Sequence, residues 1–268
     1  MKKRLLAACA LSALLLNACG TAADPGVTTN PDNGSDAQAA QTELTVFAAA
    51  SLTESLEEIQ KNYETVDPSV KLVYNFDSSG TLKTQIEEGA VCDVFLSAGQ
   101  KQMDGLGELV QADSRIDLLQ NTVVLVVPKD TGNTTLDFHK LGEVGSIALG
   151  NADVPVGQYA QEILTNLNLW DTLNSAGKIT FGSNVKEVTA QVAAAAVDCG
   201  VVYRTDAASE PEITVAAEAP ADTYSPAVYP AAVLEQSEHA AQAQAFLDYL
   251  QTDAAMDVFK SVGFSKPA

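Results

Sequence analysis

Residues 44–63, LTVFAAASLTESLEEIQKNY, contain the pattern that decides the fold. They begin with a short apolar run of strand length, Leu44 to Ala50. A helical stripe follows, with apolar residues at spacings of 4, 3 and 4: Leu52, Leu56, Ile59 and Tyr63. A strand that leads directly into a helix is the repeating unit of α/β proteins with parallel sheets.

The same alternation continues along the chain. Short apolar runs predict strands at 70–76, 94–96, 122–127, 147–149, 179–181, 201–203 and 228–234. Helical stripes separate them, including one through Met103, Leu106 and Val110. Strands that are apolar on both faces indicate parallel sheets covered by helices on both sides. The segment AVCDVFLSA (90–98) loosely resembles AVDCGVVYRTDA (196–207), which suggests two similar lobes.

The first 42 residues have the composition of an export signal and a tether. Three basic residues precede an apolar stretch, 5–16, that is too short for a membrane-spanning helix of about 20 residues. Residues 1–18 are therefore predicted to be a lipoprotein signal peptide. The motif LNACG (16–20) predicts lipidation of Cys19, although an ordinary signal peptide with an incidental cysteine stays open. Residues 19–42 are expected to be a disordered tether that anchors an extracytoplasmic protein to the membrane.

Charge and cysteine usage narrow the classes of partner. Acidic residues outnumber basic residues 35 to 15, giving a formal net charge of −20, which argues against a nucleic-acid partner. Cys92 and Cys199 remain after the signal and the lipidation site are set aside. Export would permit a disulfide. Because each cysteine comes just before a predicted strand, we expect two buried free thiols in separate lobes.

Enzymatic motifs are scarce in the sequence. It contains no Walker loop, nucleophile elbow or zincin motif. His139 and His239 lack metal-ligand spacing and are expected at the surface, so no side chain is expected to bind a metal directly. A hydrolase or transferase with Ser51 or Ser79 as nucleophile would need a base that neither histidine is placed to supply. An adhesion module is a further alternative.

Strands that lead through small or hydroxyl residues into helices recur four times. The segments are 47–52, 76–81, 154–157 and 183–186. Helix N-termini present unpaired N–H groups, so several of them at the carboxyl ends of strands predict an anion site. Simpler explanations stay open: a capping box of Ser51 with Glu54, a turn at 78–80, Pro155 as a helix starter, and Tyr203 as a core residue.

Several segments together resemble the periplasmic molybdate-binding proteins of ABC transporters. They are TVFAAASL (45–52), FDSSGTLKTQIEEGAVCDVFLSAGQKQMD (76–104), NTVVLVVP (121–128), VPVGQYAQ (154–161), LWDTL (169–173), GVVYRTDA (200–207) and DVFKSVGF (257–264). The resemblance implies a two-lobed type II periplasmic-binding-protein fold with the ligand between the lobes. Residues 43–122 and 227–268 would form lobe 1, and residues 123–226 would form lobe 2.

The resemblance also implies a ligand set and partners. Ser51 and Ser79 would donate from their hydroxyl and N–H groups, Val156 and Val185 from their N–H groups, and Tyr203 from its phenol. The expected ligand is molybdate or tungstate, with sulfate or phosphate as the alternative. No cofactor is expected, and the protein would act as a monomer that delivers the anion to a permease.

One residue departs from the pattern of the resembled family. Asp77 stands where related sequences often have a small neutral residue. We expect its side chain to point to solvent or to cap the following helix locally. A carboxylate that faced the cleft would repel a dianion but would accept a hydrogen bond from monohydrogen phosphate, and would therefore favour phosphate.

Overall fold

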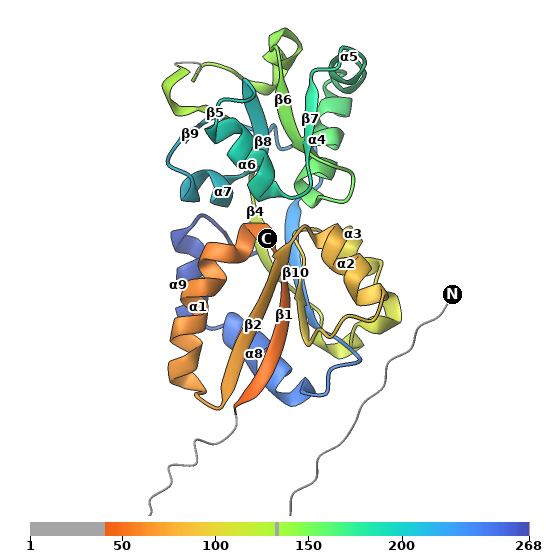
Figure 1. Ribbon diagram of the computed structural model, residues 1–268, viewed down its shortest axis with the longest axis vertical. Coiled ribbons are helices and arrows are strands. Elements are labelled where there is room, and N and C mark those ends of the chain that lie inside the picture. Colours follow the sequence, from red (N-terminus) through yellow and green to blue (C-terminus); the bar gives the residue numbers. More distant parts are fainter. Residues whose placement is uncertain (1–40, 132–133, 268) are drawn as a thin grey trace, which may run out of the picture. The chain divides into compact units, whose positions relative to one another are not determined.

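Two five-stranded β-sheets organise residues 41–131 and 134–267, the part of the chain that this computed structural model describes (Figure 1). The first sheet has the order β2-β1-β3-β10-β4, with β1 Thr42–Ala49, β2 Val70–Asp77, β3 Val94–Leu96, β10 Ala227–Val233 and β4 Ile116–Asn121. The second has the order β7-β6-β8-β5-β9, with β7 Ile179–Gly182, β6 Ile147–Gly150, β8 Cys199–Tyr203, β5 Val123–Pro128 and β9 Ile213–Glu218.

The two sheets have the same topology. Each begins with three parallel strands, β2-β1-β3 in one and β7-β6-β8 in the other. The fourth strand, β10 or β5, runs antiparallel to both of its neighbours. The similar segments 90–98 and 196–207 contain β3 and β8, which hold the same central place. The predicted two-lobed α/β fold is confirmed, with one antiparallel strand added inside each sheet.

The chain passes between the sheets twice. It leaves the first sheet after β4 and enters β5 through Thr122, and it returns from β9 to β10 through residues 219–226. We call the part of the molecule around the first sheet the first lobe (41–121 and 227–267). The second lobe comprises 122–131 and 134–226. Thr42, placed by the sequence at the end of the tether, pairs with Val70 as the first residue of β1.

Helices cover the sheets on both faces. The α-helices are α1 Thr53–Val66, α2 Ser79–Glu87, α3 Gln100–Asp104, α4 Pro155–Asn166, α5 Trp170–Ser175, α6 Val185–Ala193, α7 Arg204–Ser209, α8 Ala240–Leu250 and α9 Asp253–Ser261. Short 3-10 helices span Ala50–Leu52, Gly107–Leu109, Ala112–Ser114, Lys129–Thr131 and Phe138–Glu143. In the first lobe, α1, α8 and α9 lie on one side of the sheet and α2 and α3 on the other (Figure 1). Within the described residues, no helix is long and apolar enough to cross a membrane.

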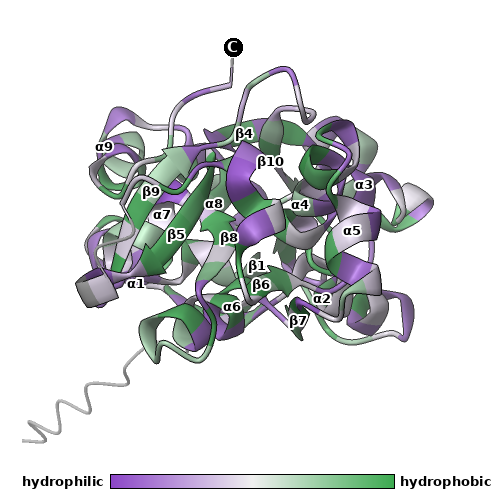
Figure 2. Ribbon diagram, turned by 90° about the horizontal axis from the view of Figure 1, so that it is seen from above, coloured by the Kyte–Doolittle hydropathy of each residue, from purple (hydrophilic) through white to green (hydrophobic). Residues whose placement is uncertain are grey.

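The apolar runs of the sequence form the core. Every residue of β5 is buried, and Figure 2 shows this strand as hydrophobic, while outer helices such as α9 carry hydrophilic residues. The stripe predicted on α1 is buried as expected, from Leu52 to Tyr63. Cys92 and Cys199 are buried free thiols, one in each lobe, which confirms the prediction. Burial raises the pKa of each thiol to about 12.

Three local predictions were incomplete. The helix expected through Met103, Leu106 and Val110 is wrong in its length, because α3 ends at Asp104 and Gly107 adopts a positive φ of 52°. Such a backbone conformation is open to glycine but interrupts a right-handed helix. Strands β4 and β9 were not among the predicted strands. Each lies at the edge of its sheet.

Candidate functional site

A small cavity lies between the lobes, at the carboxyl ends of the parallel strands. Its lining comes from both lobes and consists of Ala49, Ala50, Ser51, Asp77, Ser78, Ser79, Ala98, Val154, Pro155, Val185 and Tyr203. The cavity volume of about 10 Å³ is room for roughly one water molecule. The two lobes are therefore closed on one another around a site that is lined mainly by hydroxyl groups and helix starts.

Four of the five predicted ligand residues line this cavity. Ser51 and Ser79 come from the first lobe, and Val185 and Tyr203 from the second. Val156 does not line it, although Val154 and Pro155 just before it do. Val156 is buried in the first turn of α4, where backbone N–H groups have no acceptor within their own helix. Pro155 is the first residue of α4, which confirms the alternative that it starts a helix.

Ala98 holds two of the hydroxyl groups in place. Its N–H donates to Ser79 Oγ at 2.9 Å, and its carbonyl accepts from the Tyr203 hydroxyl at 3.2 Å. Since the Ser79 oxygen accepts from Ala98, the Ser79 hydroxyl hydrogen is available to a ligand. Burial raises the pKa of Tyr203 well above its ordinary range, so the phenol keeps its hydrogen, which it donates to the Ala98 carbonyl.

Ser51 does not cap a helix, so the capping-box alternative is wrong. The residue lies in the 3-10 helix Ala50–Leu52, and the N-cap position of α1 is Leu52, without a side-chain bond. Ser51 Oγ lies 2.9 Å from the hydroxyl of Tyr229 on β10. Glu54, the expected reciprocal partner, contacts Lys186 of the second lobe instead.

Two helices at the site have side-chain caps that were not predicted. Ser78 accepts from Thr81 N–H at 3.1 Å at the start of α2, and Asn184 accepts from Glu187 N–H at 3.0 Å at the start of α6. The sequence contained a signal for the second cap, because asparagine three residues before glutamate is a capping-box pattern. Both caps fix helix starts that line the cavity.

Asp77 is one of the residues that line the cavity, and its expected position is wrong in part. Its Oδ1 accepts locally from Ser78 N–H at 2.7 Å, but it also accepts from Asn184 Nδ2 of the second lobe at 3.3 Å. The residue is half-buried rather than turned to solvent. A carboxylate is therefore present at the edge of a site whose other polar groups are mainly donors.

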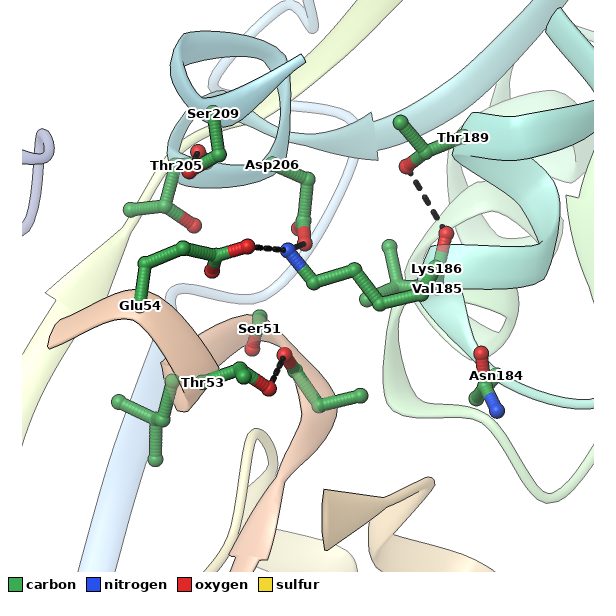
Figure 3. A network of polar contacts seen from close by, with 12 residues as sticks. Ser51, Thr53, Glu54, Asn184, Val185, Lys186, Thr189, Thr205, Asp206 and Ser209 are labelled. Carbon is green, nitrogen blue, oxygen red and sulfur yellow. Dashed lines mark hydrogen bonds and ion pairs between the residues drawn. The ribbon is translucent and has the colours of Figure 1, made fainter. Parts of the chain in front are cut away.

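A charged network joins the lobes beside the cavity (Figure 3). Lys186 Nζ lies 2.6 Å from Glu54 Oε1 on α1 and 3.5 Å from Asp206 Oδ1 on α7. Asp206 is fully buried, and within the described residues neither carboxylate oxygen has a hydrogen-bond partner. Burial raises the pKa of Asp206 to about 7, an effect that the positive charge of Lys186 opposes.

The site lacks the groups of an enzyme. His139 is exposed, and His239 is half-buried at the N-cap of α8, where it lines a different cavity with Cys92 and Asp93. Neither histidine lines the cavity of Ser51 and Ser79. Across residues 41–131 and 134–267, no group of three His, Cys, Asp or Glu side chains could hold a metal ion. Fold and site together define a two-lobed receptor for a small solute.

Known proteins agree with this class. The family described as bacterial extracellular solute-binding protein matches residues 44–265. The "Putative ABC transporter substrate-binding lipoprotein YvgL" of Bacillus subtilis (strain 168) is 42% identical over 83% of this chain and 86% of its own length. A molybdate-binding protein of Haemophilus influenzae is 37% identical over 85% of this chain and 91% of its own. The periplasmic molybdate-binding protein of Azotobacter vinelandii has the same fold, with a TM-score of 0.75 at 24% identity, covering 84% of this chain and all of the other.

The chain belongs to the family of bacterial extracellular solute-binding proteins and is related to the molybdate-binding proteins of ABC transporters. Members of this family are non-enzymatic components of transport and act outside the cytoplasm. The alternative of a hydrolase or transferase is therefore wrong.

Proposed function

We propose that this protein binds molybdate, or tungstate, between its lobes and delivers it to the permease of an ABC importer. The observation that carries the proposal is the set of donors around the cavity. Ser51, Ser79 and Tyr203 line the cavity with hydroxyl groups, of which Tyr203 now donates to Ala98 and would turn to a ligand. Val185 at the start of α6 lines it as well, and we propose that Val156 in the first turn of α4 adds a further N–H group.

A site made mainly of donors suits a fully deprotonated tetrahedral dianion. Such an anion offers only acceptors, and neutral N–H and O–H groups in a closed cleft can hold it through charge-assisted hydrogen bonds. Backbone donors account for valine at two of the proposed ligand positions. The donor pattern suits sulfate equally, so we propose that the spacing of the donors once the lobes close around an anion selects the larger molybdate.

Asp77 supports a second candidate, monohydrogen phosphate. Its carboxylate lies at the rim of the cavity and could accept the proton that phosphate carries. We favour molybdate because Asp77 Oδ1 already accepts hydrogen bonds from Ser78 N–H and Asn184 Nδ2. The relatives whose names state a ligand support the same choice.

The predicted signal peptide, the predicted lipid at Cys19 and residues 20–40 of the predicted tether lie outside the described residues. We propose that the lipid and the tether hold the receptor at the membrane, where it works as a monomer and needs no cofactor. The lipoprotein name of the Bacillus subtilis relative supports this anchoring. Replacing Cys19 with serine should release the protein from the membrane fraction into the medium or periplasm.

Isothermal titration of the purified protein with molybdate tests the proposal. We expect one binding event per chain, and a large loss of affinity in Ser79→Ala, which removes a hydroxyl from the centre of the site. Heat of binding with phosphate alone would favour the second candidate. No binding of any tetrahedral oxyanion would contradict both.

A further inference from the structure

A chain of buried hydrogen bonds runs behind Ser51, on the side away from the cavity. Tyr229 on β10 and Asn121 at the end of β4 are both almost completely buried. The Tyr229 hydroxyl lies 2.9 Å from Ser51 Oγ and 3.2 Å from Asn121 Nδ2. The two strands that carry these residues adjoin the points where the chain crosses between the lobes.

The orientation of the Asn121 amide is set by its neighbours. Its Oδ1 accepts from the N–H of Thr122 at 2.8 Å, so its Nδ2 faces the other way. There it donates to Thr205 Oγ1 at 2.9 Å and to the Tyr229 oxygen at 3.2 Å. An amide nitrogen carries two hydrogens and cannot accept. The Tyr229 oxygen is therefore the acceptor of this bond.

The direction of the Asn121–Tyr229 bond bears on the direction of the bond between Tyr229 and Ser51. Burial raises the pKa of Tyr229 well above its ordinary range, so its phenol keeps its hydrogen. A buried hydroxyl hydrogen without an acceptor costs free energy, and Ser51 Oγ at 2.9 Å is in position to accept it. Tyr229 thus donates to Ser51. The oxygen of Ser51 accepts, and its own hydrogen is left to point into the cavity.

The hydroxyl oxygen of Ser79 also accepts a hydrogen bond, in this case from Ala98 N–H. Both serine hydroxyls of the site therefore keep a hydrogen to present to a ligand, and one lone pair of each is already occupied. We infer that Asn121 and Tyr229 are positioning residues that fix Ser51 as a hydrogen-bond donor, and that they thereby select fully deprotonated oxyanions over oxyanions that carry a proton. This inference rests on the proposed oxyanion site.

A comparison of sulfate with monohydrogen phosphate tests this selection against a proton on the anion. At about pH 8 both are tetrahedral dianions of similar size, but only phosphate carries a proton that needs an acceptor. Binding of both, and of molybdate, is measured by competition titration for the unchanged protein, Tyr229→Phe, Ser51→Ala and the double variant. Tyr249→Phe is the matched control, since its ring packs against Tyr63 in the first lobe, away from the site.

In Tyr229→Phe the Ser51 oxygen can turn to accept, so the preference for sulfate over phosphate should fall about three- to tenfold, the equivalent of one hydrogen bond. Because Tyr229 acts through Ser51, Tyr229→Phe should leave the preference unchanged when added to Ser51→Ala. Tyr249→Phe should match the unchanged protein.

An unaltered preference in Tyr229→Phe, or a shift that persists in the Ser51→Ala background, would overturn the inference while leaving the oxyanion site intact. Failure of the unchanged protein to bind any of the three anions would instead overturn the proposed function, and the inference with it.

Discussion

The amide nitrogen of Gly80 lies 3.1 Å from the carbonyl oxygen of Asp153, and this hydrogen bond joins the first lobe to the second at the rim of the cavity. A Cβ atom at Gly80 would overlap that oxygen and lie 2.8 Å from Asp153 Cβ. Gly80 is in the first turn of α2 and has no positive φ, so its own lobe does not require glycine.

We therefore predict that Gly80→Ala hinders closure without harming folding. Alanine favours a helix over glycine by up to about 1 kcal/mol, so thermal stability without ligand should be unchanged or higher. Molybdate affinity should fall at least about tenfold, because closing the lobes now needs a backbone shift. Titration calorimetry measures the molybdate affinity, and thermal unfolding measures the stability without ligand. Unchanged affinity would mean that this contact does not take part in binding.

The Glu54–Lys186 ion pair should also favour the closed form. In Glu54→Gln the charge on the first lobe is lost, and we expect anion affinity to fall by up to about fivefold, as for a partly exposed pair. Glu58→Gln is the control, because Glu58 pairs with Lys61 on the same helix. Equal affinities in the two variants would rule out a role for the interlobe pair.

Asp206 should make stability depend on pH in a definite direction. Its pKa of about 7 in the folded protein is above the ordinary value of 3.8, so the folded state holds the proton more tightly between these limits. The free energy of unfolding should therefore fall as pH rises from about 4 to 7. Relative to Asp206→Asn, the loss should be on the order of 3 kcal/mol. The free energy of unfolding is measured by denaturant titration of the unchanged protein and of Asp206→Asn at each pH. The same pH dependence in the two proteins would contradict the prediction.

Asp77 should weaken binding of a dianion through its charge. Asn at this position keeps an oxygen that can accept from Ser78 N–H and Asn184 Nδ2, but it removes the charge. Molybdate affinity should rise about three- to tenfold in Asp77→Asn, because a like charge at the rim is removed. Asp257→Asn, on the outer helix α9, should change nothing. A fall in molybdate affinity would show that the charge itself assists binding.

Much of the fold was predictable because burial leaves a periodic trace in the sequence. The stripe of α1 and the runs of β5 and β8 are fully buried, so hydrophobic periodicity identified them. Strands β4 and β9 were missed because both are edge strands with exposed positions. Their pairing with β10 and β5 depends on residues about 90 to 110 positions away, which no local pattern reports.

The candidate site was likewise predictable only in part. Ser79 and Val185 lie at helix starts shortly after strands, so the strand-to-helix pattern covered their segments, while their selection as ligand residues came from the resemblance to the molybdate-binding proteins. The partners of Ser51 could not be located, since Tyr229 is 178 residues away and resembles a core residue in a strand. Lys186 and Asp206 were read only as part of quoted motifs. Their pairing within the second lobe follows from the packing of α6 against α7.

The most direct test of the oxyanion site is a thermal-unfolding scan of the protein with molybdate, tungstate, sulfate or phosphate. Ligand at about 1,000 times its dissociation constant stabilises the folded state by roughly 4 kcal/mol. For a protein of this size, each kcal/mol raises Tm by about 2–4 °C. We predict a rise of about 8–16 °C with molybdate and tungstate and little with the smaller anions. A rise with phosphate alone would contradict molybdate as the ligand, and no rise with any of the four would contradict the oxyanion site itself.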